Sequence, residues 1–294
     1  MAAVGPNPDR FMPVTDLLVA LRRPRVMGIV NVTPDSFSDG GRFLATDDAV
    51  HHGRQLLADG ADILDIGGES TRPGATRPLV AEELARVVPV IEELAAEGAA
   101  ISVDTMRAEV ARAAIDAGAR IVNDVSGGLA DPRILDVVAD SEALYVAMHW
   151  RAHGATMQQF TDYPDGVVET VRAELTARLD AALGAGIAAE RLVLDPGLGF
   201  SKTAEQNWEL LRGLDRIADL GRPVLVGASR KAFLGALLAD EEGRPRPIGE
   251  RESAHTAIVV QLAQAGTWCL RVHDVRAARD ACAVVEKMTE EQQR

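Results

Sequence analysis

Cysteine is scarce in this chain of 294 residues, which contains only two. Cys269 lies in an apolar run and Cys282 in a segment with helical periodicity, and no CxxC pair or other metal-ligand spacing accompanies them. A disulfide framework or a thiolate metal site is therefore excluded as the organising feature of the fold. We expect both thiols to be buried in a protein that works in a reducing cytosol.

Long apolar runs are also missing. No run reaches the roughly 18 residues that suggest a membrane-spanning helix. Residues 1–24 contain Asp9, Arg10, Asp16 and several prolines, and they lack the uninterrupted apolar stretch of a signal peptide. These absences predict a soluble, cytoplasmic protein without a membrane partner.

Positive charge is in deficit, because 31 Lys and Arg residues face 44 Asp and Glu residues and give a formal net charge of -13. Such a chain repels polyanions unless it carries a local basic stripe, and no such run occurs. Nucleic acids are therefore poor candidates for partners, and a small-molecule substrate is favoured. Hydrophobic residues make up 47% of the chain, which is enough for a large core.

Short apolar, β-branched runs recur along the chain and predict eight strands. They lie at 26–30, 63–66, 100–103, 121–122, 144–148, 192–194, 224–226 and 269–272. Segments rich in alanine and leucine separate most of them and have helical period, for example 81–96, 167–183 and 254–265. This alternation indicates parallel pairing, and runs apolar at nearly every position suit strands buried on both faces. We predict an α/β fold, a single (β/α)8 TIM barrel.

One barrel accounts for nearly the whole chain. We assign residues 1–24 to an N-terminal extension, 25–289 to the barrel and 290–294 to a polar C-terminal tail. The charged, proline-containing segment 240–251 is expected to be a solvated loop before a helix that begins near Glu252.

Polar residues stand at or just beyond the ends of the expected strands. They are Asn31, Asp65, Asp104, Asn123, Asp195 and, past the last strand, His273. In a TIM barrel the C-terminal ends of all strands meet at one mouth, where active sites are built. The sequence therefore predicts one active site, at the C-terminal ends of the strands.

Seven motifs follow these strands in order. They are Asn31-Val32-Thr33-Pro34-Asp35-Ser36-Phe37-Ser38-Asp39-Gly40-Gly41, Gly67-Gly68-Glu69-Ser70-Thr71-Arg72-Pro73-Gly74, Ser102-Val103-Asp104-Thr105, Asn123-Asp124-Val125-Ser126-Gly127-Gly128, Leu194-Asp195-Pro196-Gly197-Leu198-Gly199-Phe200, Gly227-Ala228-Ser229-Arg230-Lys231 and Arg271-Val272-His273-Asp274. One motif alone is weak, but seven in register across nearly the whole chain form a specific pattern. On this pattern the chain resembles the dihydropteroate synthases, pterin-binding TIM-barrel enzymes.

The resemblance implies a transferase of folate biosynthesis. Such an enzyme condenses 6-hydroxymethyl-7,8-dihydropterin diphosphate with p-aminobenzoate and gives 7,8-dihydropteroate and diphosphate. It implies catalytic roles for Asp35, Arg72, Lys231, Arg271 and His273. It implies substrate contacts from Phe37, Thr71, Pro73, Asp104, Asn123, Met148, Asp195, Phe200, Gly227, Ser229, Arg230, Lys231, Arg271 and His273. A homodimer is expected from the resemblance alone.

The implied pterin pocket fits the chemistry of the ring. The amino-pyrimidinone edge carries adjacent N–H donors, which the Asp195 carboxylate would accept as a pair. Asp104 and Asn123, on neighbouring strands, would complete the hydrogen bonding, although caps on loops are the alternative for both. Met148 and Phe200 are expected to be the apolar walls of a flat slot, with ordinary core packing as the alternative. Lys231 would donate to the pterin carbonyl oxygen and a ring nitrogen, and a cap on a helix terminus is the alternative for this lysine.

The resemblance also implies a diphosphate cradle. Arg271 and His273 leave the last strand near a helix expected to begin around Asp274, and barrels often bind phosphate at this place. Asn31 would contact a magnesium ion held chiefly by diphosphate oxygens and water. A structural role in a turn is the alternative for Asn31.

The loops 33–41 and 71–77 are expected to order over the substrates as a lid, since both follow strands and contain Gly, Pro and Ser. Their implied contributions to the p-aminobenzoate pocket are Asp35, Phe37, Thr71, Arg72 and Pro73. Ser229 and a helix starting near Arg230 would receive the carboxylate of p-aminobenzoate. A surface ion pair is the alternative for Arg72.

The implied mechanism needs no protein nucleophile. The bond from carbon to the diphosphate oxygen breaks first or early, and the aromatic amine captures the cationic dihydropterin methylene. Magnesium, Arg271 and His273 would take up the developing charge of the diphosphate.

Two other functions use the same fold. A methyltransferase that moves a methyl group from a folate to a corrinoid protein would not need the Ser-Arg-Lys segment or the Arg-Val-His end. A non-catalytic pterin-binding paralogue would depart from the family in its loops or its anion cradle. The chain keeps Asp35, Arg72, Lys231, Arg271 and His273, so an active synthase is favoured.

A pair of histidines, His149 and His153, has the spacing of a helical metal pair. Without the glutamate that a metalloprotease places between them, this spacing is poor support for a metal site. We expect structural roles for both.

Overall fold

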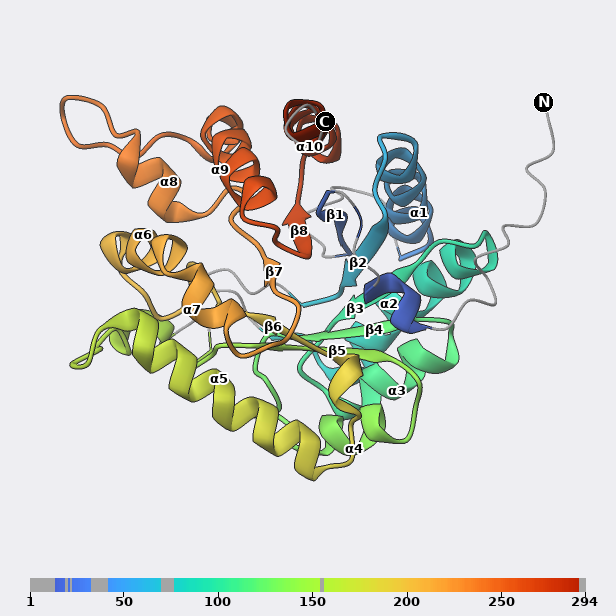
Figure 1. Cartoon of the computed structure of the whole chain (residues 1–294). Helices are drawn as coiled ribbons and strands as arrows, with labels where there is room; N and C mark the ends of the chain where they lie inside the picture. The colour runs from blue at the N-terminus through green and yellow to red at the C-terminus, as the bar shows by residue number, and fades with distance from the viewer. Residues whose placement is uncertain are drawn as a thin grey trace.

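Eight parallel strands surrounded by helices make up the described part of the chain (Figure 1). The computed structural model describes residues 14–18, 21, 23–32, 42–69, 77–153 and 156–290. The strands are β1 (Arg25–Asn31), β2 (Ile63–Gly67), β3 (Ile101–Asp104), β4 (Ile121–Asp124), β5 (Leu144–Met148), β6 (Leu192–Asp195), β7 (Leu225–Val226) and β8 (Cys269–Val272). Each lies within a residue or two of the expected position.

Helices follow every strand. They are α1 (Arg42–Ala58), α2 (Val80–Ala96), α3 (Ala108–Asp116), α4 (Arg133–Ala139), α5 (Val167–Gly184), α6 (Ala204–Arg212), α7 (Leu214–Ala218), α8 (Ala232–Leu237), α9 (Glu252–Gln264) and α10 (Val275–Glu290). Short 3₁₀ helices occupy Val14–Leu18, Met157–Gln159, Ala189–Arg191 and Ile248–Glu250. The helical segments named above as examples, 81–96, 167–183 and 254–265, are confirmed as α2, α5 and α9.

The strands close on themselves into a barrel. Their order in the sheet is β6-β5-β4-β3-β2-β1-β8-β7, and every pairing is parallel. A single parallel bridge between Leu194 and Val224 joins the two outermost strands of this order. The predicted (β/α)8 TIM barrel is confirmed.

Two apolar cores explain why the strands are apolar at nearly every position. In β1, Val26 and Val30 face outward and pack with the helices, whereas Met27 faces the barrel interior. Successive side chains of a strand point to opposite faces, so a strand in a barrel buries both of its faces. The two cysteines belong one to each core, and both are free and buried, as expected.

The N-terminal end of the barrel is closed by part of the expected extension. Leu17 and Leu18 pack against the interior core, and the Trp268 indole donates a hydrogen bond of 3.0 Å to the backbone oxygen of Leu17. This arrangement leaves the opposite end of the barrel, where the strands terminate, to the candidate site. At the other terminus, α10 extends to Glu290, one residue past the predicted boundary.

The helix expected near Arg230 begins two residues later, at Ala232, because Arg230 has a φ of 61°, a left-handed conformation that a right-handed helix cannot contain. Residues 240–250 are exposed as predicted, but Arg251, assigned to the same solvated loop, is buried. No helix in the described residues is both long and apolar enough to traverse a bilayer.

Candidate active site

The register of the strands brings the predicted polar residues to one rim. Asp104 pairs with Asn123, and Met148 with Asp195, at the C-terminal ends of β3 to β6. Asn31 ends β1 beside Gly67. The prediction that these strand ends lie together is confirmed by this register.

Arg271 joins Asp65, within β2, to Asp104, at the end of β3. Its Nε donates to Asp65 Oδ2 at 2.6 Å and its Nη2 to Asp104 Oδ2 at 2.7 Å. The Asn123 amide also donates to Asp65 Oδ2, at 3.0 Å. Arg271 of β8 is therefore linked to Asp65 and Asp104 directly and to Asn123 through Asp65, and its Nη1 takes part in neither of its two contacts.

Burial and charge oppose each other in this group. Burial, together with the nearby carboxylate of Asp65, raises the pKa of Asp104 to about 7, although Arg271 opposes the shift. Burial works against the charge of Arg271, but Asp65 and Asp104 together raise the pKa of Arg271 above its ordinary value. Arg271 therefore stays charged, while Asp104 is poised to exchange a proton near neutral pH.

Asp195 and Lys231 stand on the next part of the rim. The Asp195 side chain is buried, and its Oδ1 accepts a hydrogen bond of 2.7 Å from the Gly197 backbone. Burial raises the pKa of Asp195, and Lys231 opposes this shift. Burial lowers the pKa of Lys231 to about 8, and Asp195 opposes that shift in turn. The two groups thus stabilise each other's charged form in poorly solvated surroundings.

Apolar surfaces border these charges. Met148 is 2% exposed and packs in one cluster with Met106 and Val125, and Phe200 packs against the same cluster. The Lys231 ammonium lies 4.6 Å from the centre of the Phe200 ring, within the range of a cation–π contact, and donates to the Leu198 backbone oxygen. The structure therefore brings Met148 and Phe200 together beside Asp195 and Lys231.

Glycines make the turn after β6 possible. Gly197 has a φ of 69°, and a Cβ there would lie 2.3 Å from the backbone oxygen of His149. Gly199 has a φ of 79°, and a Cβ there would lie 2.8 Å from Cδ of Lys231. Only glycine combines these backbone angles with so close an approach, so the motif after Asp195 is fixed by sterics.

Ser229 and His273 form a second polar pair near Arg271. The Ser229 hydroxyl lies 2.9 Å from His273 Nδ1, and the His273 backbone N–H donates to the same hydroxyl oxygen at 3.2 Å. The hydroxyl proton is therefore free to point at Nδ1, which in the neutral imidazole places the ring proton on Nε2. Gly227 lies beside the stem of Arg271, since a Cβ on it would be 3.6 Å from the Arg271 Cβ.

Other predicted residues have different surroundings. Arg230 is exposed. Asn31 is partly exposed and offers an amide oxygen, although among the described residues no group of three or more His, Cys, Asp and Glu is arranged to hold a metal ion. A carbonyl oxygen suits magnesium, and a diphosphate substrate would supply further oxygens, so Asn31 fits an ion that is held mainly by its ligand. Asp35, Phe37, Thr71, Arg72 and Pro73 lie outside the described residues.

Three buried residues of this region were not predicted to act in the site. Asp65 was recognised as a strand-end polar group, but its partnership with Arg271 spans 206 positions and has no local signal. Lys202 is 3% exposed and lies just beyond the glycine turn. Arg251 donates to the backbone oxygen of Arg230 at 2.9 Å and so supports the segment that leads into Lys231.

Known proteins share this fold and these motifs. Residues 27–273 match the family model described as pterin binding enzyme. The chain is 53% identical over 268 residues to the dihydropteroate synthase of Mycobacterium leprae, which covers 91% of this chain and 94% of the relative. The dihydropteroate synthase of Xanthomonas albilineans, solved with 4-aminobenzoic acid, aligns with a TM-score of 0.83 at 48% identity over 91% of this chain and 93% of that chain. The Xanthomonas albilineans synthase in complex with 7,8-dihydropteroate aligns with a TM-score of 0.79 at 46% identity over 91% of this chain and 94% of that chain.

Proposed function

This chain belongs to the dihydropteroate synthase family of pterin-binding enzymes, and from this premise we propose how its own residues carry the reaction. The enzyme condenses 6-hydroxymethyl-7,8-dihydropterin diphosphate with p-aminobenzoate to form 7,8-dihydropteroate and diphosphate. In this alkyl transfer a carbon–oxygen bond breaks, a carbon–nitrogen bond forms, and the aromatic amine loses a proton. The protein must therefore bind a flat polar ring, hold a polyanionic leaving group and admit a second aromatic substrate.

The assignment of roles rests on Asp195 and Lys231, whose charges interact beside the apolar side chains of Met148 and Phe200. Asp195 keeps Oδ2 and lone pairs on Oδ1 for two N–H donors of the pterin edge. The Lys231 ammonium lies 4.6 Å from the centre of the Phe200 ring and would donate to the pterin carbonyl oxygen. Met148 and Phe200 would cover the faces of the ring.

The neighbouring group of Arg271, Asp104 and Asn123 completes the pterin site in this proposal. Asn123 is held by Asp65, so its amide is oriented before the ligand arrives. Asp104 accepts a hydrogen bond from Arg271 and would also face the bound pterin. Its carboxyl group can donate to a ring nitrogen when it is protonated and accept from a ring N–H when it is ionised. Groups already fixed in the free protein need little reorganisation when the substrate binds.

Loss of diphosphate is the step in which negative charge develops. Two groups would donate hydrogen bonds to the oxygens of the departing diphosphate. They are Nη1 of Arg271 and the Nε2–H of His273, whose ring is oriented by Ser229. No covalent bond to the protein is required, because the amine of p-aminobenzoate is itself the nucleophile. Stabilisation of the leaving group is then the main contribution of these side chains.

Magnesium is proposed as the cofactor, with Asn31 as its protein ligand. When bound, the ion would neutralise charge on the diphosphate. Calorimetric titration with the pterin diphosphate tests this assignment. Removing magnesium should weaken binding in the wild-type chain and have a smaller effect in Asn31→Ala, whereas equal losses in both proteins would contradict a role for Asn31.

The p-aminobenzoate pocket remains a proposal based on the family motifs. Asp35, Phe37, Thr71, Arg72 and Pro73 would shape it, and Ser229 and Arg230 would face the carboxylate. The exposed position of Arg230 supports a place at the entrance of the site. The helix expected near Arg230 is α8, which begins two residues later, at Ala232.

We also propose that the enzyme is a cytoplasmic homodimer. Free buried thiols suit a reducing compartment. Large exposed apolar side chains on α8 and α10, namely Leu237, Val284 and Met288, supply surface that a second copy would bury. Light scattering coupled to size-exclusion chromatography tests the dimer, which a monomeric mass at micromolar concentration would contradict.

The decisive test of function is product formation from the two substrates with magnesium. Wild-type protein should release dihydropteroate and diphosphate, and Asp195→Asn and Lys231→Ala should lose most of this activity. A wild-type chain that binds the pterin diphosphate without turnover would instead support a non-catalytic pterin-binding protein. The dihydropteroate synthase relatives and the paired Ser229 and His273 favour the synthase over both alternatives considered above.

A further inference from the structure

A buried lysine lies directly behind the turn that follows Asp195. The Nζ atom of Lys202 is 2.9 Å from the Gly197 oxygen, 3.0 Å from the Phe200 oxygen and 2.9 Å from His149 Nδ1. These three partners occupy all the positions that a lysine nitrogen offers. Lys202 thus fastens both ends of the turn 197–200 to the end of β5.

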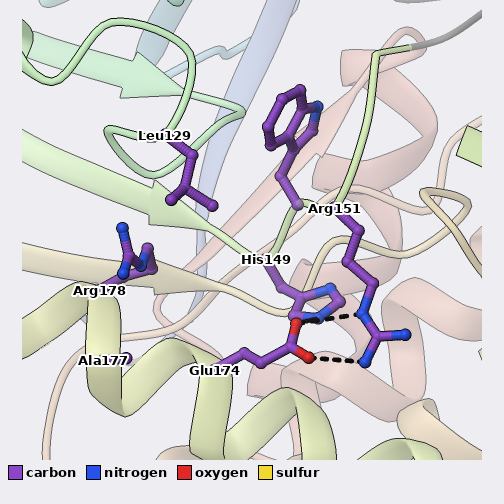
Figure 2. Close-up of a pocket in the computed structure, with 7 residues that line it drawn as sticks. Leu129, His149, Arg151, Glu174, Ala177 and Arg178 are labelled. Atoms are coloured by element: carbon purple, nitrogen blue, oxygen red, sulfur yellow. Dashed lines mark hydrogen bonds and ion pairs between the residues drawn. The ribbon is translucent and has the colours of Figure 1, made fainter. Parts of the chain in front are cut away.

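His149 continues this chain of contacts toward the surface. Its Nε2 lies 2.8 Å from Glu174 Oε2, and the second oxygen of Glu174 accepts from Arg151 Nη2 at 2.6 Å. The His149 side chain is 1% exposed, whereas that of Glu174 is 39% exposed. Figure 2 shows this outer end, where His149, Arg151 and Glu174 line a pocket of about 290 Å³ between α5 and the loop after β5.

The donors and acceptors in this series of hydrogen bonds match when Lys202 and His149 share one proton. An ammonium on Lys202 donates three bonds, including one to a neutral His149. An amine on Lys202 donates two bonds and accepts one from the imidazolium form of His149. In both arrangements Nε2 of His149 carries a proton that Glu174 accepts, so the geometry survives whichever residue holds the charge.

The surrounding charges fit this arrangement. Burial and the neighbouring Lys202 together lower the pKa of His149 to about 4, although Glu174 opposes the shift. Burial also lowers the pKa of Lys202 well below its ordinary value, and Lys231 acts in the same direction while Asp195 opposes it. The hydrogen bonds from His149 and Arg151 outweigh burial and lower the pKa of Glu174 to about 2, so Glu174 stays ionised.

We propose that Lys202 and His149 are positioning residues for the pterin, which hold the turn 197–200 so that Asp195 and Phe200 keep their ring-binding positions, and that Glu174 fixes this pair from outside the barrel. The proposal rests on the proposed function of the slot. It differs from a purely structural role because the pair fastens the particular backbone atoms on which the slot depends. Small displacements of such groups weaken binding strongly.

Substitutions of His149 distinguish a role in positioning the pterin-binding residues from a role in the stability of the fold alone. Asparagine carries its amide oxygen on Cγ, where histidine carries Nδ1, and so preserves an acceptor for Lys202. Leucine fills similar space without an acceptor. We expect His149→Leu to weaken the binding of pterin diphosphate about tenfold and His149→Asn to retain most of the affinity, as measured by calorimetry on folded protein. Equal affinity in the two variants would overturn the proposal.

A substitution at Glu174 tests the outer end of this series of hydrogen bonds and leaves the proposed pterin-binding residues unchanged. Glu174→Gln removes the charge that faces His149 and should weaken pterin binding by roughly threefold, with little change in the KM for p-aminobenzoate. Glu169→Gln is the matched control, since Glu169 is on the same helix in an exposed ion pair with Arg216. Identical pterin affinities for Glu174→Gln and Glu169→Gln would contradict the role given to Glu174.

Separate measurements of pterin diphosphate binding and of dihydropteroate formation distinguish a failure of this inference from a failure of the proposed function. If the wild-type chain binds pterin diphosphate but forms no dihydropteroate, the synthase function fails while the binding comparison still tests the positioning pair. If wild type turns over and His149→Leu binds the pterin diphosphate as tightly as wild type, the positioning role fails alone. Thermal unfolding of each variant shows whether the protein compared is folded.

Discussion

Replacing Arg271 by methionine removes the one cation that joins Asp65 and Asp104. The side chains of Arg271, Asp65 and Asp104 are 22%, 0% and 11% exposed, so solvent cannot replace the lost contacts fully. Methionine keeps most of the apolar stem and offers no donor. The substitution therefore isolates the contribution of the guanidinium.

The cost follows from two charge-assisted hydrogen bonds and the carboxylates left behind. Breaking a buried ion pair by removing one partner costs about 3–5 kcal/mol. Arg271→Met should reduce the free energy of unfolding by this amount near neutral pH. Arg276→Met is the matched control, because Arg276 is 71% exposed in its pair with Asp59 and should cost about 1 kcal/mol or less.

The loss should depend on pH in a defined direction. Burial raises the folded-state pKa of Asp104 from 3.8 to about 7, so its contribution to stability is complete below the lower value and is lost as pH rises through the higher one. Arg271 lowers this pKa, and without Arg271 it rises further. The difference between wild type and Arg271→Met should therefore be larger at about pH 8.5 than at about pH 6.

Urea unfolding at both pH values measures these quantities. A companion comparison in the Asp104→Asn background should show a smaller effect of Arg271→Met, since one of the two partners is then neutral. A loss below about 1 kcal/mol, or a loss that is larger at the lower pH, would refute the account of this ionic group.

Three further predictions concern the rest of the site. Ser229→Ala should weaken binding of the pterin diphosphate by roughly fivefold but leave binding of the corresponding pterin alcohol unchanged, because His273 loses its orienting hydroxyl; calorimetry with both ligands checks this. Gly197→Ala should destabilise the protein by about 2 kcal/mol or more and weaken pterin binding, since its Cβ would meet the His149 oxygen; unchanged melting and affinity would contradict the steric argument. The kcat/KM for the pterin diphosphate should fall as pH rises through about 8, where the Lys231 ammonium is lost, and Lys231→Met should lack this alkaline limb in its pH–rate profile.

The barrel could be predicted from the sequence because its signals are local. Each buried strand appears in the sequence as a short apolar run, because its two faces are buried in the two cores. The polar residues that end the strands could be placed at one mouth by the same reasoning. Asn123, Asp104 and Asp195 accordingly lie on one rim of the structure.

The partners of these residues could not be predicted in the same way. The contact of Arg271 with Asp65 joins β8 to β2, and the contact of Lys202 with His149 joins the loops after β6 and β5. Nothing in the spacing of the chain indicates which of several strand-end carboxylates an arginine will meet. Arg251 was misassigned for a related reason, because a charged, proline-containing segment resembles a solvated loop even when one of its side chains turns inward.

The backbone conformation after β7 also could not be predicted from the local sequence pattern. Arg230 adopts a left-handed backbone that non-glycine residues rarely use, and Arg251 stabilises it by binding its carbonyl oxygen. That compensation depends on a side chain 21 positions away. The expected helix consequently starts at Ala232 and places Lys231 at its boundary.

A crystal structure of this chain with bound 7,8-dihydropteroate would show directly whether these residues form the pterin site. We expect the pterin ring to lie between Met148 and Phe200, with its amino-pyrimidinone edge on Asp195 and its carbonyl oxygen near Lys231. A ligand bound elsewhere, or a pterin edge that touches neither Asp195 nor Lys231, would contradict it.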